Sequence, residues 1–295
     1  MSSNDLQGTQ SVFDNQAEVV NDIYVVTSNW FVNRCPIVTR TPRVPVGSTT
    51  FSIVSRRSRS RVASLSPVGI IQYCQTWKYP VQVSGSLQAS IGFQTSPDLQ
   101  TPFDQSKMDA LQNLMDDMES STYYGLGEDP SIAAKPKQKG LKTLLAVNNT
   151  VNPTNAGAYK ATDFLRDTLE IARSGGGDPD VLLLSTNFML GLATWGQAVM
   201  RMNAGTNVFG TPIDVFEAPF LGGVAIIEAP LLKPFTAVAL TSSEVRMRMK
   251  RNEFWNPRGS RGDSFEGDWM AEGAIEIENP AHHAWLEGVT AFSAN

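Results

Sequence analysis

The sequence predicts an α+β fold, and three patterns support this prediction. Apolar and polar side chains alternate over residues 71–83, which is typical of a half-buried strand. Apolar residues then recur at helical spacing between residues 101 and 124, and strand-like alternation returns after residue 241. The chain has 295 residues, of which 41% are hydrophobic and 18% charged, so it has a globular composition and the length of one large domain or two ordinary ones.

The composition argues against several functional classes. Two cysteines and two histidines are too few for a disulfide scaffold or a metal centre built from these residues, and we expect no cofactor. With 24 basic and 29 acidic side chains the formal net charge is −5, which is unfavourable for general nucleic-acid binding. The N-terminal residues lack an export signal, and no apolar stretch reaches the ~18 residues that span a bilayer. We therefore expect a soluble cytoplasmic protein without a membrane partner.

Charge is segregated along the chain. Residues 1–22 carry four acidic side chains and no basic one. Residues 23–97 carry eight basic side chains and no acidic one, whereas residues 98–129 carry eight acidic side chains and only Lys107 as a base. A block of one sign needs a partner of the other sign, so we expect the two blocks to pair, either within one chain or between copies.

The basic block predicts a long β-hairpin. Residues 50–54 form its first strand, the alternating stretch from Ile71 forms the second, and the tip between them is rich in serine and arginine. At ~3.3 Å per residue the second strand would be roughly 43 Å long. An isolated two-stranded hairpin is only marginally stable in water, so this arm needs another surface to lie on. A strand pair inside an ordinary sheet is the alternative, and the pattern fits it equally well.

A helix of about 20 residues, roughly 30 Å long, is predicted to follow. Thr101 is a suitable N-cap, Pro102 occupies the first helical position, and Gly125 marks the end. The apolar stripe is formed by Met108, Leu111, Leu114, Met115 and Met118. The opposite, polar face is formed by Asp109, Gln112, Asp116 and Glu119.

The remaining chain predicts a mixed body of helices and short strands. Its elements are a helix from Thr162, a buried strand at 181–184, a helix from about 185 to 204, a hairpin of 213–216 with 224–227, and half-buried strands near 245–250 and 268–278. Arg246, Arg248 and Lys250 share one strand face. This strip could touch DNA or pair with acidic residues of a neighbouring subunit, and we favour the second alternative.

Motifs for catalysis are missing, so no catalytic residue is predicted. The sequence contains no G-x-S-x-G elbow and no phosphate-binding loop. His282 and His283 are adjacent, so a strand would point them to opposite faces, and we predict a structural role for both. Cys35 and Cys74 flank the predicted hairpin; a disulfide is one alternative, and free thiols are favoured in the cytoplasm.

The order of these parts resembles one protein family. Four short stretches carry the resemblance: Arg34-Cys35-Pro36-Ile37-Val38, residues 75–86, Lys139-Gly140-Leu141 and Gly262-Asp263-Ser264. Together with the acidic N-terminal stretch, the basic hairpin and the long helix, they are similar to the major capsid proteins of tailed bacteriophages, which have the Hong Kong 97 type of capsid fold. The resemblance covers nearly the whole chain and depends on the order and spacing of the motifs.

The resemblance implies a division of the chain into parts. These are an N-terminal arm (1–42), an extended hairpin loop (43–80), a peripheral domain with a spine helix (81–150 and 241–295), and an axial α/β domain (151–240) that meets its copies around five-fold and six-fold axes. Two departures from the family matter. No lysine lies between Cys35 and Trp77, so a lysine–asparagine crosslink from the loop cannot form. A long charged helical extension at the N-terminus is also missing, which implies a separate scaffold protein or trimming before residue 1.

The function implied by the resemblance is structural and not enzymatic. We expect a major capsid protein, located in the virion capsid and assembled in the host cytoplasm into an icosahedral shell around double-stranded DNA. The expected partners are copies of itself in hexamers and pentamers, with scaffold, portal and cement proteins in addition and with packaged DNA contacted weakly. The alternatives are an encapsulin-type bacterial nanocompartment shell, a tail-tube or decoration protein, and a carboxylate-based hydrolase using the acidic side chains of residues 98–129.

We expect the basic hairpin of one subunit to lie across the acidic helix region of the next. The basic set is Arg40, Arg43, Arg56, Arg57, Arg59 and Arg61. The acidic set is Asp98, Asp104, Asp109, Asp116, Asp117 and Glu119. The apolar arm is Ile71, Tyr73, Trp77 and Tyr79. An exposed ion pair contributes only ~0–1 kcal/mol, so the ion pairs would direct orientation while apolar burial, at about 25 cal/mol per Å², would carry more of the stability.

Overall fold

The structure is a computed structural model with two larger sheets and two separate pairs of antiparallel strands. It describes residues 33–54, 69–89, 101–129, 135–145, 149–192, 195, 203–204, 214–218, 222–259 and 262–293. Among these residues, no helix combines the length and apolar character needed to cross a bilayer. The predicted α+β class is confirmed.

The first sheet has four strands in the order β1-β13-β14-β4. Their bounds are Arg43–Pro45 for β1, Val245–Arg258 for β13, Ser264–Ile277 for β14 and Gln75–Ser84 for β4. The strands β13 and β14 form a long antiparallel hairpin, β4 continues the sheet antiparallel to β14, and β1 is parallel to β13. As predicted, Val245, Met247 and Met249 are buried on one face of β13.

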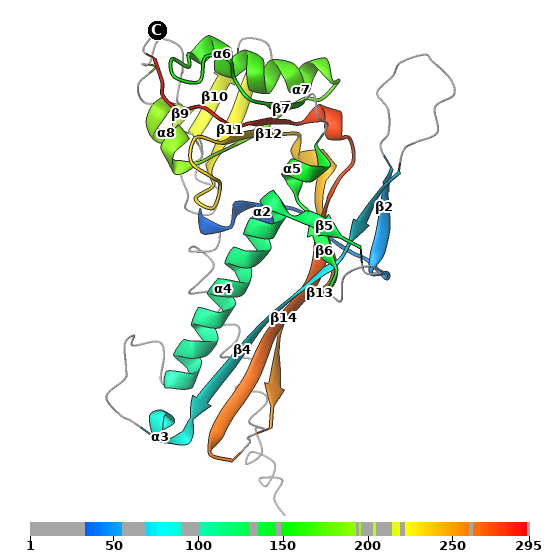
Figure 1. Cartoon of the computed structure of the whole chain (residues 1–295), viewed down its shortest axis with the longest axis vertical. Coiled ribbons are helices and arrows are strands. Elements are labelled where there is room, and N and C mark those ends of the chain that lie inside the picture. The colour runs from blue at the N-terminus through cyan, green and yellow to red at the C-terminus, as the bar shows by residue number, and fades with distance from the viewer. Residues whose placement is uncertain are drawn as a thin grey trace, which may run out of the picture.

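The long helix α4 (Pro102–Tyr124) lies beside this sheet and shares its core (Figure 1). The predicted cap is confirmed, because the Thr101 hydroxyl oxygen accepts a hydrogen bond from the Asp104 amide at 3.2 Å. Gly125 ends the helix, as its position in the sequence predicts. The buried stripe contains Leu111, Leu114, Met115 and Met118, which pack with side chains of the sheet.

The second sheet has seven strands in the order β7-β15-β12-β8-β11-β10-β9. Their bounds are Thr150–Val151 for β7, Ala284–Leu286 for β15, Ala237–Leu240 for β12, Val181–Leu184 for β8, Gly222–Glu228 for β11, Asp214–Ala218 for β10 and Asn203–Ala204 for β9. A helical segment covers it, formed by α6 (Ala161–Leu165), a π-helical turn (Arg166–Glu170) and α7 (Ile171–Ser174). The predicted strand at 181–184 and the predicted hairpin, which is β10 with β11, are confirmed.

Two expectations about this region differ from the structure. The predicted helix up to residue 204 is wrong at its end, because α8 is helical over Thr186–Leu192 and Asn203–Ala204 is a strand. The strand β15 pairs with β12 and β7, although the implied boundary at residue 241 assigns it to the other part of the chain. The backbone groups of a strand need hydrogen-bond partners, and the nearest sheet edge can come from a distant part of the chain. The position of a strand in the sequence therefore does not determine which sheet it belongs to. The domain boundaries themselves stay a prediction.

The predicted hairpin exists, but it is shorter than expected. Strands β2 (Thr50–Val54) and β3 (Gly69–Tyr73) pair antiparallel and project to one side of the body (Figure 1). The expected single strand over residues 71–83 is wrong, because it is interrupted at Cys74, whose amide donates to the Thr49 carbonyl oxygen at 2.8 Å. Beyond Cys74 the chain joins β14 as β4, so this half of the expected arm lies on its own body.

The burial pattern reverses at the same point. In β4 the odd-numbered Trp77, Val81 and Val83 are buried, as the alternation predicts. In β3 the even-numbered Gln72 is fully buried, whereas Ile71 is 50% exposed. The two strands have different partners, and a break between strands resets which side chains face the core.

Short elements connect these parts. They are α2 (Pro36–Arg40), α3 (Gly85–Gln88), β5 (Leu126–Glu128), β6 (Lys137–Lys139), α5 (Leu141–Leu144) and the 3₁₀ turns Ser242–Glu244 and Pro280–His282. Cys35 and Cys74 are both buried and free. The Cys35 thiol donates to Asp116 and the Cys74 thiol to the Ser48 carbonyl oxygen, each at 3.6 Å, so the favoured free thiols match the structure.

Candidate subunit-contact surfaces and the joint between the sheets

Of the six arginines in the basic set, two precede the hairpin and four belong to the segment between its two strands. Arg43 donates two hydrogen bonds to the Glu253 carboxylate of its own chain, at 2.5 and 2.9 Å. Arg40 is half-buried beside a small cavity of about 90 Å³ between α2, β8 and β12, and burial lowers its pKa. The other four arginines, at 56, 57, 59 and 61, lie outside the described residues, so their contact with a neighbour stays a prediction.

Much of the acidic set is engaged within the subunit. Asp116 accepts hydrogen bonds from Arg34 Nε at 2.9 and 3.0 Å, and Asp117 accepts one from the Tyr79 hydroxyl. Asp104 accepts a hydrogen bond from Thr101 at 2.6 Å. Asp109 is exposed on α4. Asp98 lies outside the described residues.

Glu119 has a different role from the predicted one. It is fully buried, and its carboxylate accepts hydrogen bonds from the amides of Ile37 (3.0 Å) and Val38 (2.8 Å) and from the Tyr123 hydroxyl (2.5 Å). Burial raises the pKa of Glu119 to about 7, although the three hydrogen bonds oppose this shift. The carboxylate therefore holds α2 against α4 and is not accessible to a neighbour, which corrects the predicted contact.

A signal for this burial was present in the sequence. Glu119 follows Met115 by four residues and Leu111 by eight, so it lies on the apolar stripe of the helix and not opposite to it. The charge of Glu119 favours the polar face of the helix, but its helical position places it among the buried side chains. Acidic residues at stripe positions are buried when donors from another segment meet them, as the two α2 amides do here.

The apolar arm is also divided by the break at Cys74. Trp77 is 4% exposed, and its indole Nε1 donates to Ser121 Oγ of α4 at 3.2 Å, so the predicted contact with a neighbour is wrong for Trp77. Tyr79 packs against the same helix. Tyr73 is half-buried, and its hydroxyl donates to Asp129 at 2.9 Å. Ile71 is exposed on the projecting hairpin and remains available to a neighbour.

The basic strip on β13 pairs with its own chain. Arg248 Nε lies 2.6 Å from Glu276, Lys250 Nζ lies 3.0 Å from Glu272, and Arg246 lies 2.6 Å from Glu278. The strip therefore already has acidic partners in its own chain, and a contact with DNA or with a neighbouring subunit stays a prediction. The acidic residues of β14 and the basic residues of β13 face one another because these strands are adjacent, and a cross-strand pair of opposite charge is favourable.

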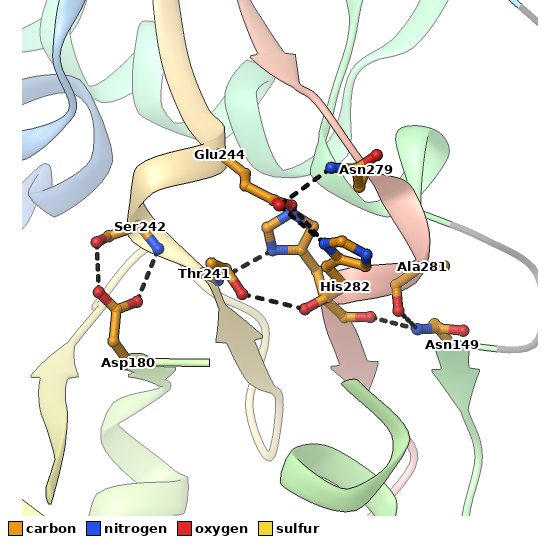
Figure 2. Close-up of polar contacts among 9 residues, drawn as sticks. Asn149, Asp180, Thr241, Ser242, Glu244, Asn279, Ala281 and His282 are labelled. Atoms are coloured by element: carbon orange, nitrogen blue, oxygen red, sulfur yellow. Dashed lines mark hydrogen bonds and ion pairs between the residues drawn. The ribbon is translucent and has the colours of Figure 1, made fainter. Parts of the chain in front are cut away.

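A polar cluster lies where the chain passes between the two sheets (Figure 2). The Glu244 carboxylate accepts from Asn279 Nδ2 at 3.0 Å and lies 2.8 Å from His282 Nδ1. The Asp180 carboxylate accepts from the Ser242 amide at 2.7 Å. Asn149 Nδ2 donates to the carbonyl oxygens of Ala281 (2.7 Å) and His283 (2.6 Å). These bonds join the three segments that connect the two sheets, which are the segment before β7, the segment between β12 and β13, and the segment between β14 and β15.

His283 is the fully buried member of this cluster. Its Nδ1 accepts a hydrogen bond from the Thr241 amide at 3.1 Å, so the proton of the neutral ring is assigned to Nε2, which lies 3.7 Å from Glu244. Burial lowers the pKa of His283 to about 3, and the adjacent His282 adds to the shift. Both histidines thus make structural contacts, in keeping with their predicted role.

Acidification is expected to weaken this joint through His283. Its pKa in the folded chain lies below the ordinary value of 6.5, so the unfolded state binds more protons between about pH 3 and pH 6.5. The free energy of unfolding should fall by about 2 kcal/mol between pH 7 and pH 5 from this group alone. The variant His283→Asn keeps an acceptor for the Thr241 amide and removes the titration. In urea unfolding of the unassembled subunit, the free energy of unfolding of this variant should therefore fall less between pH 7 and pH 5 than that of the unmutated chain. An equal fall would contradict the role given to His283.

Comparison with solved structures defines the class of the fold. The chain is similar to the holo-SrpI encapsulin of Synechococcus elongatus PCC 7942, with 12% identity, a TM-score of 0.59 and 86% of each chain covered. It is also similar to a virus-like particle of Pyrococcus furiosus (13% identity, TM-score 0.55, 92% of this chain and 96% of the other). A structure of Mycobacterium phage Bobi gives 14% identity, a TM-score of 0.53 and coverages of 86% and 90%. The fold is therefore the Hong Kong 97 type of capsid fold.

The family follows from the sequence itself. The family model described as SU10 major capsid protein matches residues 6–290, and the chain belongs to this family. A search of curated proteins found no match. The protein is thus a structural major capsid protein that self-associates in the virion capsid and is not an enzyme. The family match favours the phage capsid over the encapsulin alternative and gives no support to the hydrolase.

Proposed function

We propose that the protein forms hexamers and pentamers of an icosahedral shell that encloses the double-stranded DNA of a tailed phage. The observation that carries this proposal is the β2–β3 hairpin, which projects from the body with Ile71 exposed, so that a neighbouring subunit is needed to cover it. Assembly takes place in the host cytoplasm, with scaffold, portal and cement proteins as further partners.

The hairpin of one subunit lies across the N-terminal half of α4 in the next. Asp116, Asp117 and Glu119 already have partners in their own subunit. The acidic residues that remain for the contact with the neighbouring hairpin are therefore Asp98 and Asp109, together with Asp104. Each exposed ion pair contributes ~0–1 kcal/mol, so the charges direct the orientation of the contact, and burial of Ile71 adds stability.

Packaged DNA is contacted only weakly in this proposal. The formal net charge of the subunit is −5. The basic strip of β13 is neutralised by β14, since Arg246, Arg248 and Lys250 each lie within 3.0 Å of a carboxylate. A strip whose cations are already paired releases few counterions on meeting DNA and therefore binds it poorly.

Negative-stain microscopy of the purified protein, alone and after co-expression with the other structural proteins of its own genome, tests the proposal. Closed shells of uniform diameter are expected under at least one of these conditions. Dispersed monomers under all of them, at every concentration, would contradict it. Shells that enclose a co-purified enzyme and no DNA would instead favour the encapsulin alternative.

A further inference from the structure

Two buried glutamines lie at the base of the hairpin. Gln72 of β3 and Gln138 of β6 are both fully buried. The Gln72 side chain donates from Nε2 to the carbonyl oxygens of Lys139 and Ile275, each at 2.8 Å, and its Oε1 accepts from the Lys139 amide at 2.8 Å. One side chain therefore connects the hairpin to β6 and to β14.

Gln138 completes the same cluster. Its Oε1 accepts from the Ile275 amide at 2.8 Å, and its Nε2 donates to Ser121 Oγ of α4 at 3.0 Å. The Gln138 amide in turn donates to Gln75 Oε1 at 3.2 Å. The backbone of Ile275 is thus bonded on both its amide and its carbonyl by glutamine side chains.

The position of Ile275 explains why side chains are needed there. Strand β4 pairs with β14 only as far as Gly273, which is opposite Gln75. Past that point no strand among the described residues pairs with this edge of β14. Buried backbone groups without a partner cost ~1–3 kcal/mol each. The side chains of the two glutamines take the place of a paired strand at this edge. Gln72 belongs to β3, which ends at Tyr73, just before β4 begins at Gln75.

Apolar packing also holds the hairpin, but it does not set a direction. Ile53 of β2 is buried in the core, and Phe51 and Ile70 pack against it. Apolar burial is non-directional, whereas hydrogen bonds weaken steeply when their angles change. The three buried bonds of Gln72, each at 2.8 Å, therefore set the angle at which the hairpin leaves the body, beside the single bond from the Tyr73 hydroxyl to Asp129 at 2.9 Å.

We propose that Gln72 is a positioning residue for assembly, which fixes the direction of the β2–β3 hairpin so that its tip meets the neighbouring subunit at one angle. This inference rests on the proposed contact of the hairpin with a neighbour. In a closed symmetric shell the same contact is repeated, so a spread of angles at one hairpin becomes a spread of curvature in the shell.

The test uses Gln72→Met, which keeps the length of the side chain and removes its hydrogen bonds. The matched control is Gln82→Met, since Gln82 is an exposed glutamine of β4 that bonds to Glu266 at 2.9 Å. Spin labels at Ser52→Cys on β2 and Asn113→Cys on α4, both exposed positions, report the hairpin angle by pulsed electron resonance in the unassembled subunit. The native Cys35 and Cys74 are buried and should not take the label.

We expect a broader distance distribution for Gln72→Met, an unchanged one for Gln82→Met, and shells of mixed diameter or open sheets only for Gln72→Met. An unchanged distribution would overturn the proposal, and so would a broadened distribution with uniform shells. If Gln72→Met does not fold, Gln72→Glu serves in its place, because a protonated carboxyl keeps the bond from the Lys139 amide and one donated bond, and it should give an intermediate width. Failure of the proposed function would appear separately, as a lack of shells from the unmutated chain.

Discussion

Reversal of the four tip arginines, Arg56, Arg57, Arg59 and Arg61, to glutamate is expected to abolish shells while the subunit stays folded. Four positive charges become four negative ones on a hairpin whose proposed partner is acidic. Like charges brought together at an interface cost several kcal/mol and suppress the encounter itself. Microscopy and sedimentation should show only small species, and circular dichroism should match the unmutated subunit.

Two further variants test whether the loss of shells comes from the pairing of the hairpin with acidic residues of the next subunit or from the change in net charge alone. Reversal of the exposed Lys135 to glutamate changes charge outside both the proposed hairpin contact and the predicted axial domain, and should leave shells intact. Adding Asp98→Lys and Asp109→Lys to the reversed hairpin should restore shells, because opposite signs then meet again. Normal shells from the reversed hairpin alone would refute the pairing, and a lack of rescue would place the partner of the hairpin elsewhere on the subunit.

Glu119→Leu is expected to cause the largest loss of subunit stability. The substitution leaves the buried amides of Ile37 and Val38 without an acceptor, and each such group costs ~1–3 kcal/mol. The free energy of unfolding should therefore fall by roughly 2–6 kcal/mol in urea titrations. Asp109→Leu, an exposed acidic residue on the same helix, is the control and should change it by less than ~0.5 kcal/mol.

The pH dependence of Glu119 has the opposite sign to that of His283. Its pKa of about 7 lies above the ordinary 4.5, so the folded state binds more protons than the unfolded state between these values. Its contribution is fully present below about pH 4.5 and is lost as pH rises through about 7, a change of up to ~3 kcal/mol. Glu119→Gln removes this titration, so its stability should decline less between pH 5 and pH 8 than that of the unmutated subunit. An equal decline would show that Glu119 is already ionised at pH 5.

Two acidic residues of α4, Glu119 and Asp116, bind the segment that contains Arg34 and α2, and we expect them to contribute unequally to stability. Glu119 fastens α2 to α4 from inside the core, whereas Asp116 binds Arg34, which is 43% exposed. An exposed ion pair contributes little, so Asp116→Asn should be close to neutral beside the effect of Glu119→Leu. The unequal response of two neighbouring acidic residues reflects burial and not charge.

The parts of the fold that depend on neighbours along the chain can be predicted from the order of the amino acids alone. The Thr101 cap, the end of α4 at Gly125 and the alternating burial of Val245, Met247 and Met249 all follow from local periodicity and capping, because the backbone repeats of helix and strand place side chains at fixed intervals. The order of the parts along the chain also indicates the capsid family.

Which surface each charged or apolar residue meets depends instead on how distant segments of the chain come together in space. The alternation around Cys74 is continuous in the sequence, yet β3 pairs with β2 and β4 pairs with β14, so the buried face changes between them. Arg248 is paired with Glu276 because their strands happen to be adjacent, 28 positions apart in the chain. A hydrogen bond or ion pair between distant segments depends on their meeting in space, and no periodicity within either segment records that meeting.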